Sequence, residues 1–192
     1  MFAEILIIGL EVEAWLVLAL LSVFGTDWLL ELDGAKDYAT LLTIVVLALA
    51  YVLGIIVDRL ADTLLDRFED TSLGNTVQEF MSKKPRFHKE SGLATMRMTV
   101  MAASDGMTPF LDYQRSRWRI ARATVLNLAI AGPVAALYLV VGTNVDWPWS
   151  LVPLVSAFVL VPITYFAGVR IQDAWVARLK DAYKIVHAAS QK

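Results

Sequence analysis

The sequence predicts an all-α integral membrane protein with four transmembrane helices, both termini in the cytoplasm, and helical extensions that form a small cytosolic bundle. Hydrophobic residues make up 57% of the 192 residues, whereas a soluble domain has about 45–50% apolar residues. Four segments approach the roughly 20 apolar residues that a helix needs to cross a bilayer. The basic residues gather between the second and third segments and after the fourth.

The four predicted spans form a single membrane domain over residues 1–192. They cover about 5–24, 39–57, 120–141 and 151–169. The first span contains two acidic residues, but no basic residue precedes it and no small-residue cleavage site follows it. We therefore interpret this segment as a retained span and not as a signal peptide.

The distribution of lysine and arginine predicts the orientation of the spans. Of the 17 basic residues, all but Lys36 lie in residues 58–122 or after residue 169. Lysine and arginine near the membrane ends favour the cytoplasmic side. The opposite loops, about 25–38 and 142–150, are acidic and carry tryptophans suited to an outer interface. We expect a multi-pass protein of the cell's inner (cytoplasmic) membrane with both termini cytoplasmic.

The predicted cytosolic part consists of a helical insertion, residues 58–119, and a C-terminal helix, residues 170–192. The second span continues as a helix, because Leu60, Leu64 and Phe68 recur at helical spacing. Thr108-Pro109 is a favourable helix start, since threonine can cap the helix and proline fits its first position. We expect that helix to run unbroken into the third span.

Polar residues concentrate in the inner third of the predicted membrane region. They are Glu11, Glu13, Asp58, Arg59, Arg119, Arg122 and Asn127. A charged group at the centre of a span costs about 2.5–3.5 kcal/mol, so it should face protein, water or a cation. Glu11 and Glu13 point about 200° apart on a helix. We expect one to face its own bundle and the other a neighbouring subunit or a water-filled space.

These polar residues allow two interpretations. In the first, Glu11 or Glu13 belongs to an ion or proton path. In the second, one of them belongs to a structural network with Arg122, Arg119 or Arg59. Glu11 and Arg122 lie at similar depth on parallel spans with opposite charge, so we expect these two residues to be coupled.

The cytosolic insertion is rich in methionine, a flexible and polarizable residue that recurs on surfaces which adapt to partners. The candidate partner-binding residues are Met96, Met98, Met101 and Met107. Their spacing also suits the core of a small helical bundle. Both interpretations stay open at this point.

A short basic run lies in the same insertion. Its cationic residues are Lys83, Lys84, Arg86 and Lys89. They are candidates for contact with lipid headgroups, or they form a solvated loop near the inner leaflet. No series of aromatic residues accompanies them, so we do not expect nucleic-acid binding.

The sequence lacks signals for chemistry. It has no cysteine and only two histidines, which excludes disulfides and thiolate zinc sites. It contains no phosphate-binding glycine loop and no nucleophile or zinc motif of the known patterns. We expect no enzyme activity, no cofactor and no metal.

The expected function is that of a small, oligomeric, four-pass protein of the inner membrane. Its cytosolic module would dock or sense a soluble partner, by analogy as a membrane subunit of a bacterial stress or phage-defence system. Small residues allow close helix approach, and we expect Gly132 on the third span to lie at the contact between copies. The alternative is an oligomeric ion or proton channel that uses Glu11 and Glu13.

Overall fold

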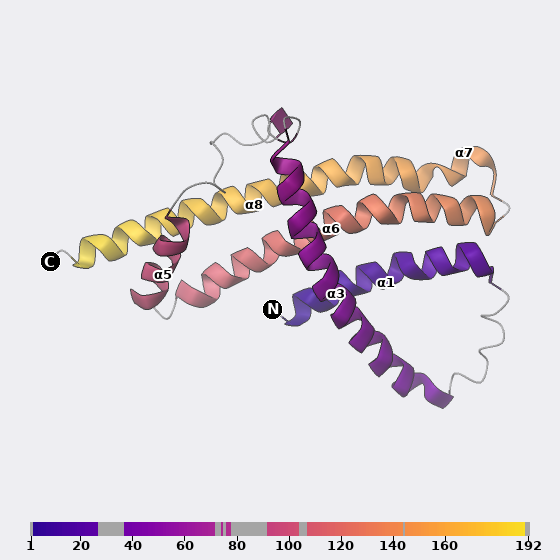
Figure 1. Cartoon of the computed structure of the whole chain (residues 1–192), viewed down its shortest axis with the longest axis horizontal. Coiled ribbons are helices and arrows are strands. Elements are labelled where there is room, and N and C mark those ends of the chain that lie inside the picture. The colour runs from indigo at the N-terminus through magenta and orange to yellow at the C-terminus, as the bar shows by residue number, and fades with distance from the viewer. Residues whose placement is uncertain are drawn as a thin grey trace.

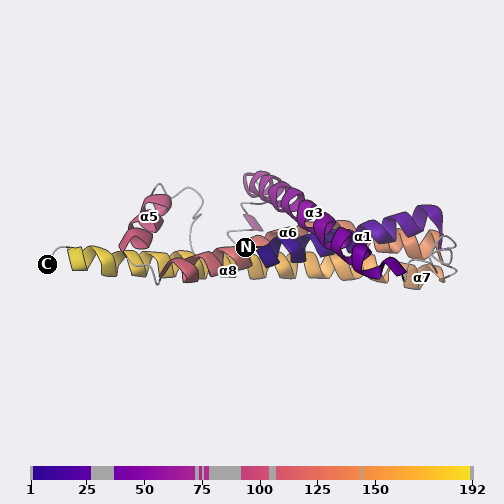
Figure 2. The same ribbon diagram turned by 90° about the horizontal axis from the view of Figure 1, so that it is seen from below.

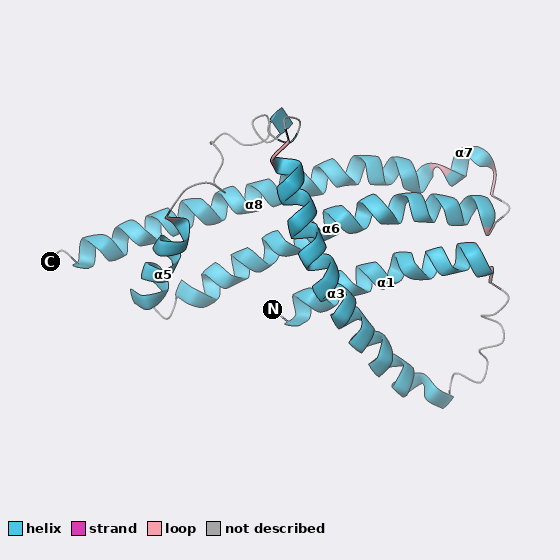
Figure 3. Cartoon of the chain, viewed as in Figure 1, coloured by secondary structure: helices cyan, strands magenta, loops and turns pink. Residues whose placement is uncertain are grey.

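The structure is a computed structural model of the chain, and it describes residues 2–26, 37–71, 74, 76–77, 92–103, 107–143 and 145–190. This part of the chain is helical and contains no strand (Figure 3). The helices are α1 (Phe2–Phe24), α3 (Ala39–Glu69), α5 (Leu93–Ala103), α6 (Met107–Val141), α7 (Trp147–Ser150) and α8 (Val152–Ser190).

Four helices are long and apolar enough to cross a membrane, as the sequence predicts. They are α1, α3, α6 from Leu111 onward, and the stretch Trp147–Ala188 of α7 and α8. Three of them extend beyond the predicted spans: α3 ends at Glu69, α6 begins at Met107 and α8 ends at Ser190. The predicted extensions are therefore continuous with the spans, without an intervening turn.

The helices form two layers. α6 and α8 lie side by side and run in opposite directions over much of the long axis of the molecule (Figure 1). α1 packs along α6, and α3 crosses this assembly obliquely, on the face that Figure 2 shows above α6 and α8. One end of α3 therefore reaches α6 and α8, whereas its beginning projects away from them.

The crossing of α1 and α3 depends on two glycines. A Cβ atom on Gly9 would lie 1.6 Å from the carbonyl oxygen of Ala50, and one on Gly54 would lie 2.0 Å from that of Ile5. No side chain fits at either distance, so glycine permits the two backbones to touch. Ile8, Val12 and other apolar residues continue this contact into a common core with α6.

Gly132 mediates a contact within the chain. Its Cβ position lies 2.2 Å from the Cβ atom of Ala157, so Gly132 lets α6 approach α8 closely. The prediction that Gly132 lies at the contact between copies is therefore corrected. Gly132 already packs against α8 of its own chain, where α6 and α8 run antiparallel.

A second core lies near the C-terminus. α5 packs against the stalk, by which we mean residues 107–119 of α6 and 170–190 of α8 (Figure 1). The buried residues are Val100, Leu111, Leu179 and Ala182, with Met96, Met101 and Trp175 packed around them. We call α5 and the stalk together the α5 module.

Candidate functional site

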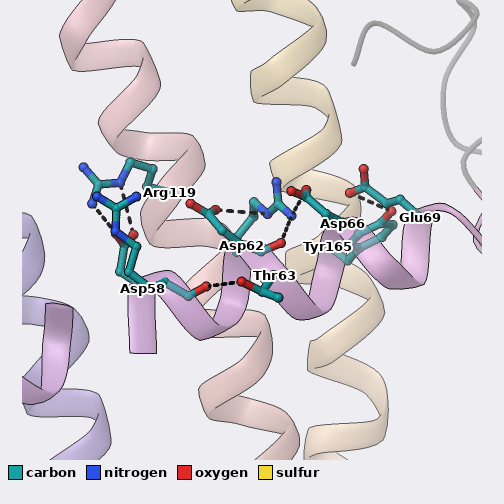
Figure 4. A network of polar contacts seen from close by, with 9 residues as sticks. Asp58, Asp62, Thr63, Asp66, Glu69, Arg119 and Tyr165 are labelled. Carbon is teal, nitrogen blue, oxygen red and sulfur yellow. Dashed lines mark hydrogen bonds and ion pairs between the residues drawn. The ribbon is translucent and has the colours of Figure 1, made fainter. Parts of the chain in front are cut away.

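One face of α3 carries a row of carboxylates where α3 crosses α6 and α8 (Figure 4). Its residues are Asp58, Asp62, Asp66 and Glu69. Spacings of three and four residues place all four on the same side of a helix. We call this row the acidic ladder. It faces arginines of α6 and a tyrosine of α8, so the polar groups of three helices meet there.

The first carboxylate of the acidic ladder, Asp58, forms a two-pronged ion pair with Arg119. Arg119 donates from Nε to Oδ1 of Asp58 at 3.1 Å and from Nη2 to Oδ2. Two parallel hydrogen bonds match the fork of the guanidinium to the carboxylate. The side chain of Asp58 is only 3% exposed, so the pair is held between α3 and α6.

Arg122 forms ion pairs with the next two carboxylates of the acidic ladder, Asp62 and Asp66. Its Nη2 donates to Oδ1 of Asp66 at 2.6 Å and to the carbonyl oxygen of Asp62 at 3.0 Å. Its Nε lies 3.6 Å from Oδ1 of Asp62. The guanidinium also lies 4.7 Å from the centre of the Trp118 ring, within the range of a cation–π contact. Arg122 is 4% exposed, and these contacts compensate its burial.

The last carboxylate of the acidic ladder, Glu69, joins α3 to α8. The hydroxyl of Tyr165 donates to Oε1 of Glu69 at 3.5 Å, and the Phe68 ring packs edge-on against the Tyr165 ring. A cavity of about 10 Å³ lies beside them, lined also by Gln172 of α8. That volume suits roughly one water molecule. The end of α3 is therefore fixed to both α6 and α8.

A separate polar cluster joins α1 to α6. Oε1 of Glu11 accepts a hydrogen bond from Thr124 at 2.9 Å, and Oε2 accepts one from Asn127 at 2.8 Å. Trp15 Nε1 in turn donates to Oδ1 of Asn127 at 3.3 Å. Asn127 is 3% exposed. Glu11 thus faces its own bundle.

The prediction that Glu11 pairs with Arg122 is wrong, because each residue has other partners. Among the described residues, Glu11 is bound by hydroxyl and amide donors, whereas Arg122 forms its ion pairs with Asp62 and Asp66. The physical reason is geometric: α3 crosses α6 in such a way that Asp62 and Asp66 lie beside Arg122.

Glu13 and Arg59 lie outside both clusters. Glu13 is partly exposed, and within the described part of the chain it makes no hydrogen bond or ion pair. Arg59 is exposed, because it follows Asp58 by about 100° around the helix. Its carbonyl oxygen accepts a hydrogen bond from Thr63 at 3.0 Å.

The candidate methionines separate into different environments. Met96 and Met101 pack against the core of the α5 module, whereas Met98 is 70% exposed. The side chain of Met107 and the basic residues Lys83, Lys84, Arg86 and Lys89 lie outside the described residues. Of the three methionines whose side chains are described, Met98 is the one exposed at the surface.

Sequence reasoning missed several members of the site. They are Trp15, Asp62, Asp66, Glu69, Trp118, Thr124 and Tyr165. The spacing of Asp58, Asp62 and Asp66 was a readable signal for the ladder, because residues four apart share a helix face. Thr124 and Tyr165 gave no such signal, since their roles depend on which helix faces them.

The site is arranged for holding helices together. Its carboxylates are engaged by arginine, tyrosine, threonine and asparagine, and no group of three or more metal-ligating side chains forms within the described ranges. Comparisons with protein-family models, with curated proteins and with solved structures find no match for this chain. Its function is therefore argued from geometry alone.

Proposed function

We propose that this chain is a small, homo-oligomeric, four-pass membrane protein whose cytosolic helical module docks or senses a soluble protein partner. One observation carries the proposal: α5 packs on the same continuous helices, α6 and α8, that supply two of the candidate spans. A partner bound to the α5 module would therefore act directly on helices that enter the membrane.

The orientation of this proposal follows from charge. Placing the α5 module and both termini in the cytoplasm puts almost all lysines and arginines on that side. The inner membrane of a bacterial cell is the proposed location, with the lipid bilayer and further copies of the chain as its membrane partners. The acidic ladder would then lie at the cytoplasmic boundary, where water offsets part of the cost of its charges.

The length of α8 supports a mechanical link between module and membrane. Its 39 residues extend about 58 Å at roughly 1.5 Å per residue, almost twice the ~30 Å hydrocarbon core. The acidic ladder fixes α3 to α6 and α8 partway along this length. A displacement of the stalk would reach α3 through these ion pairs, and this is the route we propose for sensing.

The docking surface includes the exposed apolar residues of the module. Met98 is 70% exposed, Tyr113 59% and Ile185 72%. Large apolar side chains left open on a part that lies in water favour contact with a protein. By analogy, we propose that the chain is a membrane subunit of a bacterial stress or phage-defence system, and that the soluble partner belongs to the same system.

Site-specific photo-cross-linking tests the docking role. A photoreactive residue in place of Met98 should form adducts with a soluble protein in living cells. The same residue in place of Phe158, which is 82% exposed on a candidate span, is the matched control and should react only within the membrane, with lipid or with a span of another copy. Equal adduct patterns at the two positions, or adducts at Met98 with copies of the chain only, would contradict docking.

A second candidate function is an oligomeric ion or proton channel, and Glu13 favours it. Glu13 lies eight residues after Ile5, where the predicted first span begins, which is about 12 Å along a helix and well inside a ~30 Å core. Glu13 has no partner within the described part of the chain, and water or a cation on an oligomer axis would contact its carboxylate. Glu11, held by Thr124 and Asn127, is the less suitable of the two for that role.

A further inference from the structure

An open apolar groove lies along α6 and α8. Its volume is about 970 Å³, and it extends on α8 from Leu154 to Tyr165 and on α6 from Val125 to Pro133. Phe68 of α3 bounds it near the acidic ladder. The side chains at its surface include Phe158, which is 82% exposed. Small residues line it as well, among them Ala129 and Ala157, and small residues allow a helix to approach closely.

The first third of α3, residues 39–49, is uncovered on every side. All of its residues are exposed, and the large apolar ones are each at least 40% exposed: Leu41, Leu42, Ile44, Val45, Val46, Leu47 and Leu49. These positions point in all directions around a helix. The burial of α3 begins at Ala50, where it meets Gly9 of α1.

The groove and the first third of α3 match in size. Residues 39–49 form a helix about 15 Å long, and the groove extends about 17 Å between Leu154 and Tyr165, both at roughly 1.5 Å per residue. A helix segment roughly 10 Å across and of that length occupies on the order of 1,200 Å³. This is the same order as the volume of the groove, about 970 Å³.

The two features also lie at the same level and on different sides of the molecule. The beginning of α3 and the α7 end of α8 lie at the same end of the long axis, with α1 and α6 between them (Figure 1). The first third of α3 therefore cannot reach the groove of its own chain. In a second copy shifted sideways in the same membrane, it would meet the groove at matching depth.

We propose that residues 39–49 of one copy occupy the α6–α8 groove of the next copy, which makes a head-to-tail contact. Because two different surfaces meet, every copy offers one of each, and the contact closes into a ring when the rotation permits. The contact covers two apolar surfaces of the same chain at once. The inference rests on the homo-oligomer part of the proposed function and specifies its interface.

Paired cysteines test the contact, since the chain contains no cysteine of its own. Val45→Cys and Phe158→Cys replace exposed side chains, so both variants should fold. The double variant, oxidised in native membranes, should give a ladder of linked chains that ends at the ring size. Two single-cysteine variants expressed together should give linked pairs only, because each linked chain then lacks a second cysteine.

The control keeps Phe158→Cys and moves the other cysteine to α1. Val17 is 48% exposed, so Val17→Cys is the same substitution on another uncovered helix. The proposed contact predicts severalfold more cross-linking for the pair at positions 45 and 158 than for the pair at positions 17 and 158. Equal yields in the two pairs, or linkage of Phe158→Cys with itself, would overturn the head-to-tail contact.

Native mass measurement of the unmutated protein separates the remaining outcomes. An oligomer without the cross-link between positions 45 and 158 defeats this interface and leaves the homo-oligomer intact. A monomeric mass, with or without bound phospholipid, defeats both. Neither result bears on docking at Met98, which the photo-cross-linking experiment tests separately.

Discussion

Asp58 of α3 and Arg119 of α6 form a two-pronged ion pair at the point where α3 begins to cross α6. Asp58 is 3% and Arg119 17% exposed at the side chain. Removing one partner of a buried pair leaves the other charge uncompensated, whereas replacing both with apolar residues can be nearly neutral.

We therefore predict that Asp58→Leu and Arg119→Met each lower the free energy of unfolding by about 3–5 kcal/mol, and that the double variant recovers most of the loss. Thermal unfolding in detergent measures this. The control is the Arg97–Asp112 pair, whose side chains are 26% and 53% exposed and whose loss should cost about 1 kcal/mol or less. Losses at positions 58 and 119 that simply add would show that the two residues act independently.

The close approach of Gly132 and Ala157 predicts a reciprocal rescue. Gly132→Ala should destabilise the chain, because its new Cβ atom would lie 2.2 Å from that of Ala157. Adding Ala157→Gly removes the opposing Cβ atom, so the double variant should unfold at a temperature close to that of the unmutated protein. Ala14→Gly, at an exposed position of α1, controls for the general cost of a helical glycine, about 1 kcal/mol. A double variant less stable than Gly132→Ala alone would contradict the contact.

The two glutamates of α1 should respond differently to the same substitution. Glu11→Leu removes the acceptor that Thr124 and Asn127 share, and among the described residues only Asn127 keeps a further contact, from its Nδ2 to the carbonyl oxygen of Ile8 at 3.4 Å, so the variant should lose about 1–3 kcal/mol. Glu13→Leu removes a side chain that has no partner in the described part of the chain, so stability in detergent should stay the same or rise. Equal losses for the two variants would argue against this assignment.

Ion flux distinguishes the docking proposal from the channel alternative. The docking proposal expects no flux through the purified protein in liposomes, with or without Glu13→Gln. If instead the unmutated protein conducts and Glu13→Gln stops the current while the protein stays folded, the channel becomes the better account. Glu11→Gln serves as the matched control on the same helix.

The orientation can be tested with single cysteines in intact cells. Cysteines introduced at Ser72, Ser91 and Ser190 should resist a membrane-impermeant thiol reagent, because the proposed orientation, which rests on the distribution of positive charge, has these segments in the cytoplasm. A cysteine at Thr143, between α6 and α7, should react. Labelling of the first three positions would reverse the proposed topology.

The sequence by itself determined the helical class and the four long apolar helices. Long apolar runs have few alternatives to helices, since every backbone polar group in hydrocarbon must be satisfied within the segment. The same reasoning correctly continued the second and third spans into longer helices, because the apolar period at Leu60, Leu64 and Phe68 does not stop where the span does.

Only the tertiary structure decided which polar groups meet. Periodicity places Asp58, Asp62 and Asp66 on one face of α3, but it does not say that this face lies against Arg119 and Arg122 of α6. That pairing depends on the oblique crossing of α3, which Gly9 and Gly54 permit through contacts shorter than any side chain would allow. A crossing angle results from the packing of two helix surfaces against each other, so the sequence of one helix does not determine it. For that reason depth and charge predict Arg122 as the partner of Glu11, whereas the folded chain gives Glu11 the donors of Thr124 and Asn127.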